Sequence, residues 1–122
     1  MPNRSVRRVA ALGAVLATGV AAVPALAHAP VIGTFPKNHA TVSHVRTVSV
    51  RFGEAVVTGL ITVKRDNGST VAPRASGLQP SNKARLRATF ARALPSGRYT
   101  VSWRALADDG HRERGTFRFR VR

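Results

Sequence analysis

The sequence predicts an all-β fold, a two-sheet sandwich or small Greek-key barrel of about seven strands. Apolar and polar residues alternate along several short runs, turn-forming residues separate these runs, and no ten-residue segment shows helical periodicity. The chain has 122 residues and no cysteine, so one small core must hold the fold without disulfide bonds. We find no internal repeat and no linker that would mark a second domain.

Four runs show the alternation most clearly. Their apolar members are Val48, Val50 and Phe52; Leu86, Ala88 and Phe90; Tyr99, Val101, Trp103 and Ala105; and Phe117, Phe119 and Val121. Side chains two residues apart lie on the same face of a strand, so each run gives a sheet one apolar and one polar face. We therefore expect these residues, Trp103 included, in the core.

Turn-forming residues mark the ends of the predicted strands. Asp66-Asn67-Gly68 follows the run Leu60–Arg65 and predicts a hairpin, because Asn-Gly readily adopts the positive φ angles of a tight turn. Pro95-Ser96-Gly97 interrupts the chain just before the run that begins at Tyr99. The segment from Gly77 to Lys83 is rich in turn-forming residues, and we expect a connecting loop there.

The first 27 residues have the features of a secretory signal peptide. Three arginines precede an apolar run from Val9 to Val23, and Ala25-Leu26-Ala27 has the small residues of a cleavage site. The run is shorter than the roughly 20 residues that a transmembrane helix needs, and an uncleaved amino-terminal anchor is the alternative. We expect cleavage after Ala27, which leaves residues 28–122 as one domain in the periplasm or outside the cell.

The chain is strongly basic, with 20 Lys and Arg against five Asp and Glu and a formal net charge of +15. Such an excess can indicate a nucleic-acid or anionic-membrane partner. The arginines alternate along strands, as in Arg118, Arg120 and Arg122, and do not cluster with aromatic residues. Export also separates the domain from nucleic acid. We expect no nucleic-acid partner and at most weak association with an anionic envelope surface.

Cleavage after Ala27 would make His28 the first residue, with a free amine and an imidazole that can chelate one metal ion. Asp109 and His111 lie two residues apart, so their side chains can point to the same side, and Gly110 eases the bend between them. Together these groups offer three nitrogens and one oxygen, a donor set that suits tetragonal Cu(II). A hydrogen-bonded Asp-x-His pair without a metal is the alternative.

Four further residues bear on this site. Glu54 has the same parity as the core residue Phe52, so we expect its carboxylate to point inward and to have a partner. Pro30 has no amide proton, so the amide nitrogen of the third mature residue cannot become a ligand. His39 and His44 lie in a polar loop, where we expect solvated side chains.

Six segments follow one another along residues 28–122 in a characteristic order. They are His28-Ala29-Pro30, Phe35-Pro36, Val50-Arg51-Phe52-Gly53-Glu54, the run from Leu94 to Ala105 with its Pro-Ser-Gly-Arg-Tyr and Ser-Trp-Arg motifs, Asp109-Gly110-His111, and Gly115-Thr116-Phe117-Arg118-Phe119. In this combination they resemble the CopC-type periplasmic copper-binding proteins of bacterial copper resistance. The resemblance covers essentially the whole predicted domain.

The resemblance implies a cupredoxin-like or immunoglobulin-like Greek-key β-barrel that binds one Cu(II) ion. By motif match, the ligands are His28, Asp109 and His111, and Glu54 lies beside them and supports the amine. Family members with two copper sites carry a Met-rich loop for Cu(I). The only methionine here is Met1, so we expect no thioether Cu(I) site.

The resemblance also implies a function. We expect a non-catalytic protein that sequesters or carries Cu(II) for copper resistance or homeostasis, with a copper-transporting membrane protein as a partner. One alternative is a histidine-brace copper oxidative enzyme, which also uses an amino-terminal histidine but leaves a coordination position open for oxygen where Asp109 would bind. The other is a structural or adhesion sandwich that binds no metal.

Overall fold

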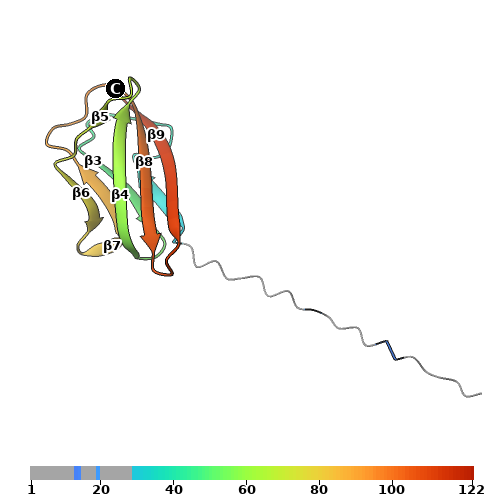
Figure 1. The fold of residues 1–122 in the computed structure, drawn as a ribbon. Helices are drawn as coiled ribbons and strands as arrows, with labels where there is room; N and C mark the ends of the chain where they lie inside the picture. Colours follow the sequence, from blue (N-terminus) through green and yellow to red (C-terminus); the bar gives the residue numbers. More distant parts are fainter. Residues whose placement is uncertain (1–12, 15–18, 20–28) are drawn as a thin grey trace, which may run out of the picture.

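Two β-sheets packed face to face make up the domain (Figure 1). The computed structural model describes residues 13–14, 19 and 29–122, and no helix occurs among them. The expected all-β fold is confirmed, and the two separate sheets make it a sandwich. Most of the predicted signal segment, its cleavage site and His28 lie outside the described residues. The described part includes no helix with the length and apolar character that crossing a membrane requires.

Nine strands occur in residues 29–122. They are β1 (Val31–Phe35), β2 (Ala40–Val42), β3 (Thr47–Phe52), β4 (Val56–Arg65), β5 (Thr70–Val71), β6 (Ala75–Gln79), β7 (Asn82–Thr89), β8 (Gly97–Ala107) and β9 (Arg112–Val121). One sheet has the order β1-β3-β7-β6 and the other β2-β9-β8-β4-β5. The very short β2 and β5 had no alternating signal, and the seven longer strands match the expected number.

The core lies between the two sheets and follows the predicted alternation. All the apolar members of the four runs are buried except Trp103, which is half-buried against the core. The buried apolar residues of the described chain all fall between Ala29 and Val121. Residues 28–122 therefore contain this core entirely, and burial of its side chains is the main force that holds the two sheets together.

The Trp103 ring lies over Gly115 on the neighbouring strand. The two residues are opposite each other in the antiparallel register, and the Trp103 ring packs edge-on against Phe52, with centroids 5.3 Å apart. A Cβ atom on Gly115 would lie 2.7 Å from Cζ2 of Trp103, which is closer than real contacts allow. Only glycine at position 115 leaves room for the indole.

The β4–β5 hairpin forms where Asp66-Asn67-Gly68 predicts it. The Gly68 amide donates a hydrogen bond to the Arg65 carbonyl (2.9 Å), and Gly68 has φ = +84°. Asn67 is not at a positive φ, contrary to the expectation from Asn-Gly; its Oδ1 instead accepts a hydrogen bond from the Ser69 amide (2.9 Å). Three residues, Asp66 to Gly68, lie between Arg65 and Ser69, whose backbones are joined by a hydrogen bond. A three-residue turn of this kind needs only one residue in the left-handed conformation.

The prediction of a connecting loop from Gly77 to Lys83 is wrong. β6 and β7 form a tight hairpin, in which Gln79 pairs with Asn82 and only Pro80 and Ser81 lie between the strands. The Asn82 side chain accepts a hydrogen bond from the Ala84 amide (3.0 Å), so a residue that predicted a loop instead supports the start of a strand. This hairpin lies at the edge of its sheet, where polar residues are tolerated and periodicity is weak.

We expect Gly115→Ala to lower the free energy of unfolding by about 1–3 kcal/mol, because the new methyl group overlaps the Trp103 ring. Urea denaturation followed by Trp103 fluorescence measures this loss. Gly33→Ala is the matched control, since its Cβ would meet only the Arg51 guanidinium at 3.5 Å and should change stability by less than about 0.5 kcal/mol. Equal losses in the two variants would contradict this account of position 115.

Candidate metal centre

Three segments that are distant in sequence meet at one end of the sandwich. The chain start, the segment after β3 and the turn between β8 and β9 are joined there by backbone contacts. The Gly53 amide donates a hydrogen bond to the Pro30 carbonyl (2.7 Å), and the first residue of β4, Val56, pairs with the last residue of β8, Ala107. We call this the metal end, because it holds the sequence-predicted metal ligands that the structure describes.

The β8–β9 turn presents Asp109 and His111 through a defined backbone geometry. The Ala107 amide donates to the His111 carbonyl (2.8 Å), and the Gly110 amide donates to the Ala107 carbonyl (3.0 Å). Gly110 has φ = +86°, a conformation that glycine adopts without strain. The turn thus has the same pattern as the β4–β5 turn, and glycine is needed at the corresponding position in both.

Asp109 and His111 lie together, as their spacing predicts. Asp109 Oδ1 accepts a hydrogen bond from the His111 amide (2.9 Å), and Oδ2 lies 2.7 Å from His111 Nδ1. The His111 side chain is 57% exposed and that of Asp109 25%, so both can be reached from solvent. A proton on Nδ1 that is donated to Asp109 leaves the lone pair of the imidazole on Nε2, where it can bind a metal.

Glu54 does not point inward as its parity suggested. β3 ends at Phe52, and the chain bends at Gly53, where the amide bonds to Pro30. The alternation between faces ends with the strand, and Glu54 is exposed. It still lies at the metal end, next to the residue that contacts the chain start. A role for Glu54 beside a metal stays a prediction.

Glu113 is the site residue that the sequence analysis missed. It lies half-buried on the inner face of β9, two residues before Gly115, and its Oε1 accepts a hydrogen bond from the buried Ala29 amide (3.1 Å). Glu113 therefore ties the chain start to the strand that follows His111. A signal was present, because Glu113 continues the every-second-residue series of Asp109 and His111.

The other histidines lie elsewhere. His39 and His44 are exposed, as expected, and the His39 amide donates to the carbonyl of Arg118 near the opposite end of β9. Residues 29–122 contain no group of three or more His, Asp or Glu side chains that could hold a metal ion by themselves. The predicted ligand set also needs His28, which lies outside the described residues.

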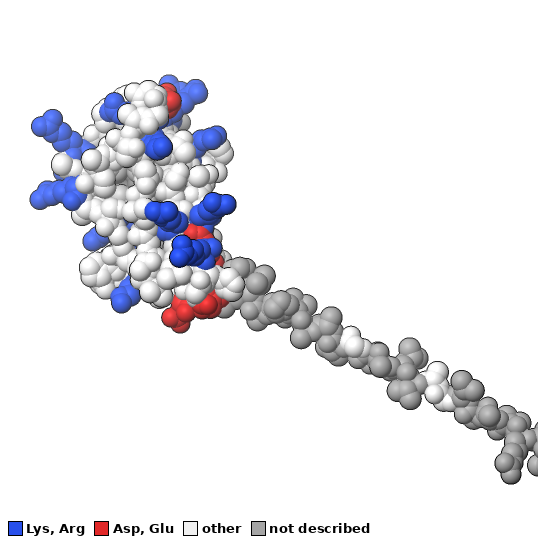
Figure 2. Space-filling model, viewed as in Figure 1, with Lys and Arg blue, Asp and Glu red and all other residues white. Residues whose placement is uncertain are grey.

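Acidic residues concentrate at the metal end of this basic molecule. Four of the five in the chain, Glu54, Asp108, Asp109 and Glu113, lie in the segments that meet there, and Figure 2 shows red atoms gathered at that end. The fifth, Asp66, lies in the β4–β5 turn at the opposite end. Carboxylates are therefore denser at the metal end than in the rest of the domain.

These features define a small β-sandwich protein with an accessible Asp-His pair and a concentration of carboxylates at one end. The CopC domain model matches residues 31–122, and the chain belongs to this family.

Two curated relatives align with nearly the whole chain. Copper resistance protein C of Xanthomonas campestris pv. juglandis is 28% identical over 123 residues, covering 95% of this chain and 97% of the relative. Protein YobA of Escherichia coli is 28% identical over 114 residues, covering 89% of this chain and 90% of the relative.

Solved structures have the same fold. CopC from Methylosinus trichosporium superimposes with a TM-score of 0.66 at 25% identity, covering 77% of this chain and 93% of that one. PcoC, a methionine-rich copper resistance protein from Escherichia coli, gives a TM-score of 0.66 at 22% identity, covering 79% of this chain and 100% of that one. The likeness to PcoC concerns the fold alone.

We expect Glu113→Val to release the chain start from β9, because the Ala29 amide loses its acceptor. Hydrogen exchange of the Ala29 amide should become faster, and the free energy of unfolding should fall by about 1–3 kcal/mol for the unpaired donor. Glu113→Gln keeps an acceptor oxygen and serves as the control. NMR exchange rates that are alike in the valine and glutamine variants would show that Glu113 does not hold Ala29.

Proposed function

We propose that the chain is exported, cleaved after Ala27, and binds one Cu(II) ion at the metal end. The observation that carries this proposal is the Asp109–His111 pair, presented by a glycine-dependent turn at the end where the chain start is anchored. The relative from Xanthomonas is named a copper resistance protein, and the structure from Methylosinus is named CopC. Their names support copper as the metal.

His28, Asp109 and His111 would supply the ligands. His28 immediately precedes Ala29, whose amide is bound by Glu113 on β9, so the chain start belongs to the end that carries His111. The amine and imidazole of a terminal His28 complete a set of three nitrogens and one oxygen, which suits tetragonal Cu(II). Ligation by Asp109 requires Oδ2 to exchange its contact with His111 Nδ1 for the metal, while Oδ1 keeps its bond to the His111 amide.

The contacts of the chain start favour ligation by the amine and the imidazole over ligation by the backbone. The Glu113 carboxylate accepts a hydrogen bond from the Ala29 amide. This bond stabilises the protonated amide, so the amide nitrogen is less ready to lose its proton and bind a metal. Pro30 has no amide proton to lose. Neither amide nitrogen is then available to Cu(II). The carboxylate of Glu54, exposed beside the chain start, is proposed to support the amine through a hydrogen bond.

The proposed role is sequestration or transport of Cu(II) for copper resistance or homeostasis, without catalysis. Asp109 would take the coordination position that an oxygen-activating site leaves open. With Met1 as the only methionine and no cysteine, the exported domain has no sulfur ligand for Cu(I). A copper-transporting membrane protein as partner and weak association with the anionic envelope are part of this proposal.

We expect His111→Ala and Asp109→Asn each to weaken Cu(II) binding by more than about tenfold, because the first removes the imidazole and the second replaces the charged carboxylate by a weakly binding neutral amide. Competition titration against a chelator of known affinity measures the change in the domain of residues 28–122. His39→Ala is the control, since His39 lies toward the opposite end of β9 and should leave the affinity unchanged. Unchanged affinity in His111→Ala would show that copper binds elsewhere.

A second experiment tests the terminus. A single extra residue before His28 converts the α-amine into an amide, so we expect the extended domain to bind Cu(II) far more weakly than the domain that begins at His28. Affinity should also fall toward acid pH, because protons compete with the metal for the amine, the imidazoles and the carboxylate. Mass spectrometry of the secreted protein, with and without Cu(II), determines the terminus and the number of ions. Equal affinity for both termini would refute the ligand set.

A further inference from the structure

We propose that the outer face of the five-stranded sheet docks onto an anionic phospholipid surface. Seven exposed cations lie on this basic face, namely Lys64, Arg98, Arg104, Arg112, Arg114, Arg118 and Arg120. They come from β4, β8 and β9, the strands that face the viewer in Figures 1 and 2, where blue atoms are spread over the surface. The inference rests on the proposed export of the domain and does not depend on copper binding.

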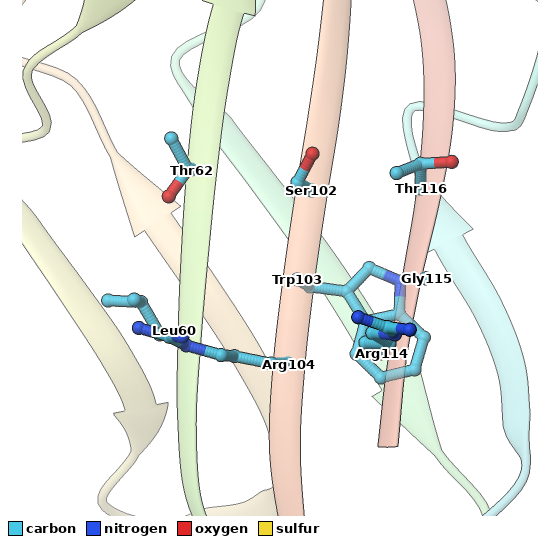
Figure 3. Close-up of a pocket in the computed structure, with 8 residues that line it drawn as sticks. All are labelled: Leu60, Thr62, Ser102, Trp103, Arg104, Arg114, Gly115 and Thr116. Atoms are coloured by element: carbon cyan, nitrogen blue, oxygen red, sulfur yellow. The ribbon is translucent and has the colours of Figure 1, made fainter. Parts of the chain in front are cut away.

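The strand register puts like charges opposite each other on this face. Arg104 pairs with Arg114, and Arg98 pairs with Arg120, because the residues between them alternate into the core. Like charges directly opposite in a sheet are destabilising. Figure 3 shows the two side chains of the first pair splayed apart, with Arg104 extending toward Leu60 on β4 and Arg114 lying over β9.

None of these seven cations forms an ion pair with another described residue. Asp66 lies beside Arg98, Arg118 and Arg120 in a hollow at the end far from His111, and Glu113, between Arg112 and Arg114, lies on the inner face of β9. Folding therefore gains no ion-pair energy from these seven cations. A negatively charged partner would offset the repulsion between the paired arginines and would itself be attracted to them.

The chemistry of the basic face suits phosphate. Six of its seven cations are arginines, whose planar guanidinium groups bind phosphate oxygens in pairs. Between them, a shallow hollow of about 660 Å³ is lined by the hydroxyl-bearing Thr62, Ser102 and Thr116 and by Leu60, which is 46% exposed (Figure 3). Hydroxyl groups can add hydrogen bonds to a headgroup, and the leucine offers a small apolar contact.

The extent of the charge favours a bilayer over an acidic peptide. Arg112 and Arg120 lie at opposite ends of β9, about 26 Å apart at about 3.3 Å per residue, and cations flank both ends of the face. The cations also come from three adjacent strands, so they spread across the sheet as well as along it. An extended acidic segment follows one line over this face, whereas a plane of headgroups meets all the cations at once. In this orientation the strands lie parallel to the membrane, and the turn with Asp109 and His111 stays open at the side.

The test uses vesicle co-sedimentation of the domain of residues 28–122. We expect binding to phosphatidylcholine vesicles with about 30% phosphatidylglycerol and none to pure phosphatidylcholine, with loss of binding between about 0.05 M and 0.5 M salt. The triple variant Arg104→Gln, Arg114→Gln, Arg118→Gln should bind roughly a hundredfold more weakly, at about fivefold per cation. The matched control is Arg51→Gln, Lys83→Gln, Arg87→Gln, which removes the same charge from exposed positions of the other sheet and should lose much less.

Each other result overturns the proposal. Equal losses in the two triple variants would mean that net charge, and no particular face, drives binding. Absence of binding to the anionic vesicles would exclude the lipid partner, and binding to polyglutamate that equals binding to vesicles would indicate an acidic protein instead. Urea denaturation confirms that both variants fold, with the basic-face variant no less stable than the parent. Cu(II) affinity, measured in the same samples, should not change, so failure here is distinct from failure of the copper site.

Discussion

The antiparallel register of β8 and β9 is the constraint on which the rest of this molecule depends. It puts Trp103 opposite Gly115 in the core, Arg104 opposite Arg114 on the surface, and Asp109 and His111 in the connecting turn. A shift by one residue would exchange the two faces of both strands. The indole would then lie in water and the arginines in the core, so packing of the core also determines the placement of the charges.

The same constraint separates the charges of the protein. Arginine fills many of the outward strand positions, while Glu54, Asp108 and Asp109 lie between strands and Glu113 lies near the start of β9 on its inner face. A domain with a formal excess of positive charge thereby keeps most of its carboxylates at one end. The proposed metal site and the proposed anionic-surface contact then use different parts of one small molecule and need not compete.

Anchoring of the chain start connects processing to the proposed chemistry. Ala29 is buried, its amide is held by Glu113, and the Pro30 carbonyl accepts the Gly53 amide. Cleavage after Ala27, as proposed, would create an amine one residue before Ala29, which these contacts hold in the domain.

The sequence by itself determined the all-β class, the inward residues of the four alternating runs, and the meeting of Asp109 with His111, because each depends on period-two geometry or on spacing within one strand or turn. Contacts between segments distant in sequence were decided only by the tertiary structure. The prediction that Glu54 points inward failed because β3 ends at Phe52, and alternation between the faces ends with it. Glu113 was missed because its hydrogen-bond partner, Ala29, is 84 residues away. The sequence did not reveal the β6–β7 hairpin, because an edge strand such as β6 needs little apolar periodicity. Local pattern thus determines which face a residue occupies, but only packing determines which residues from distant segments meet.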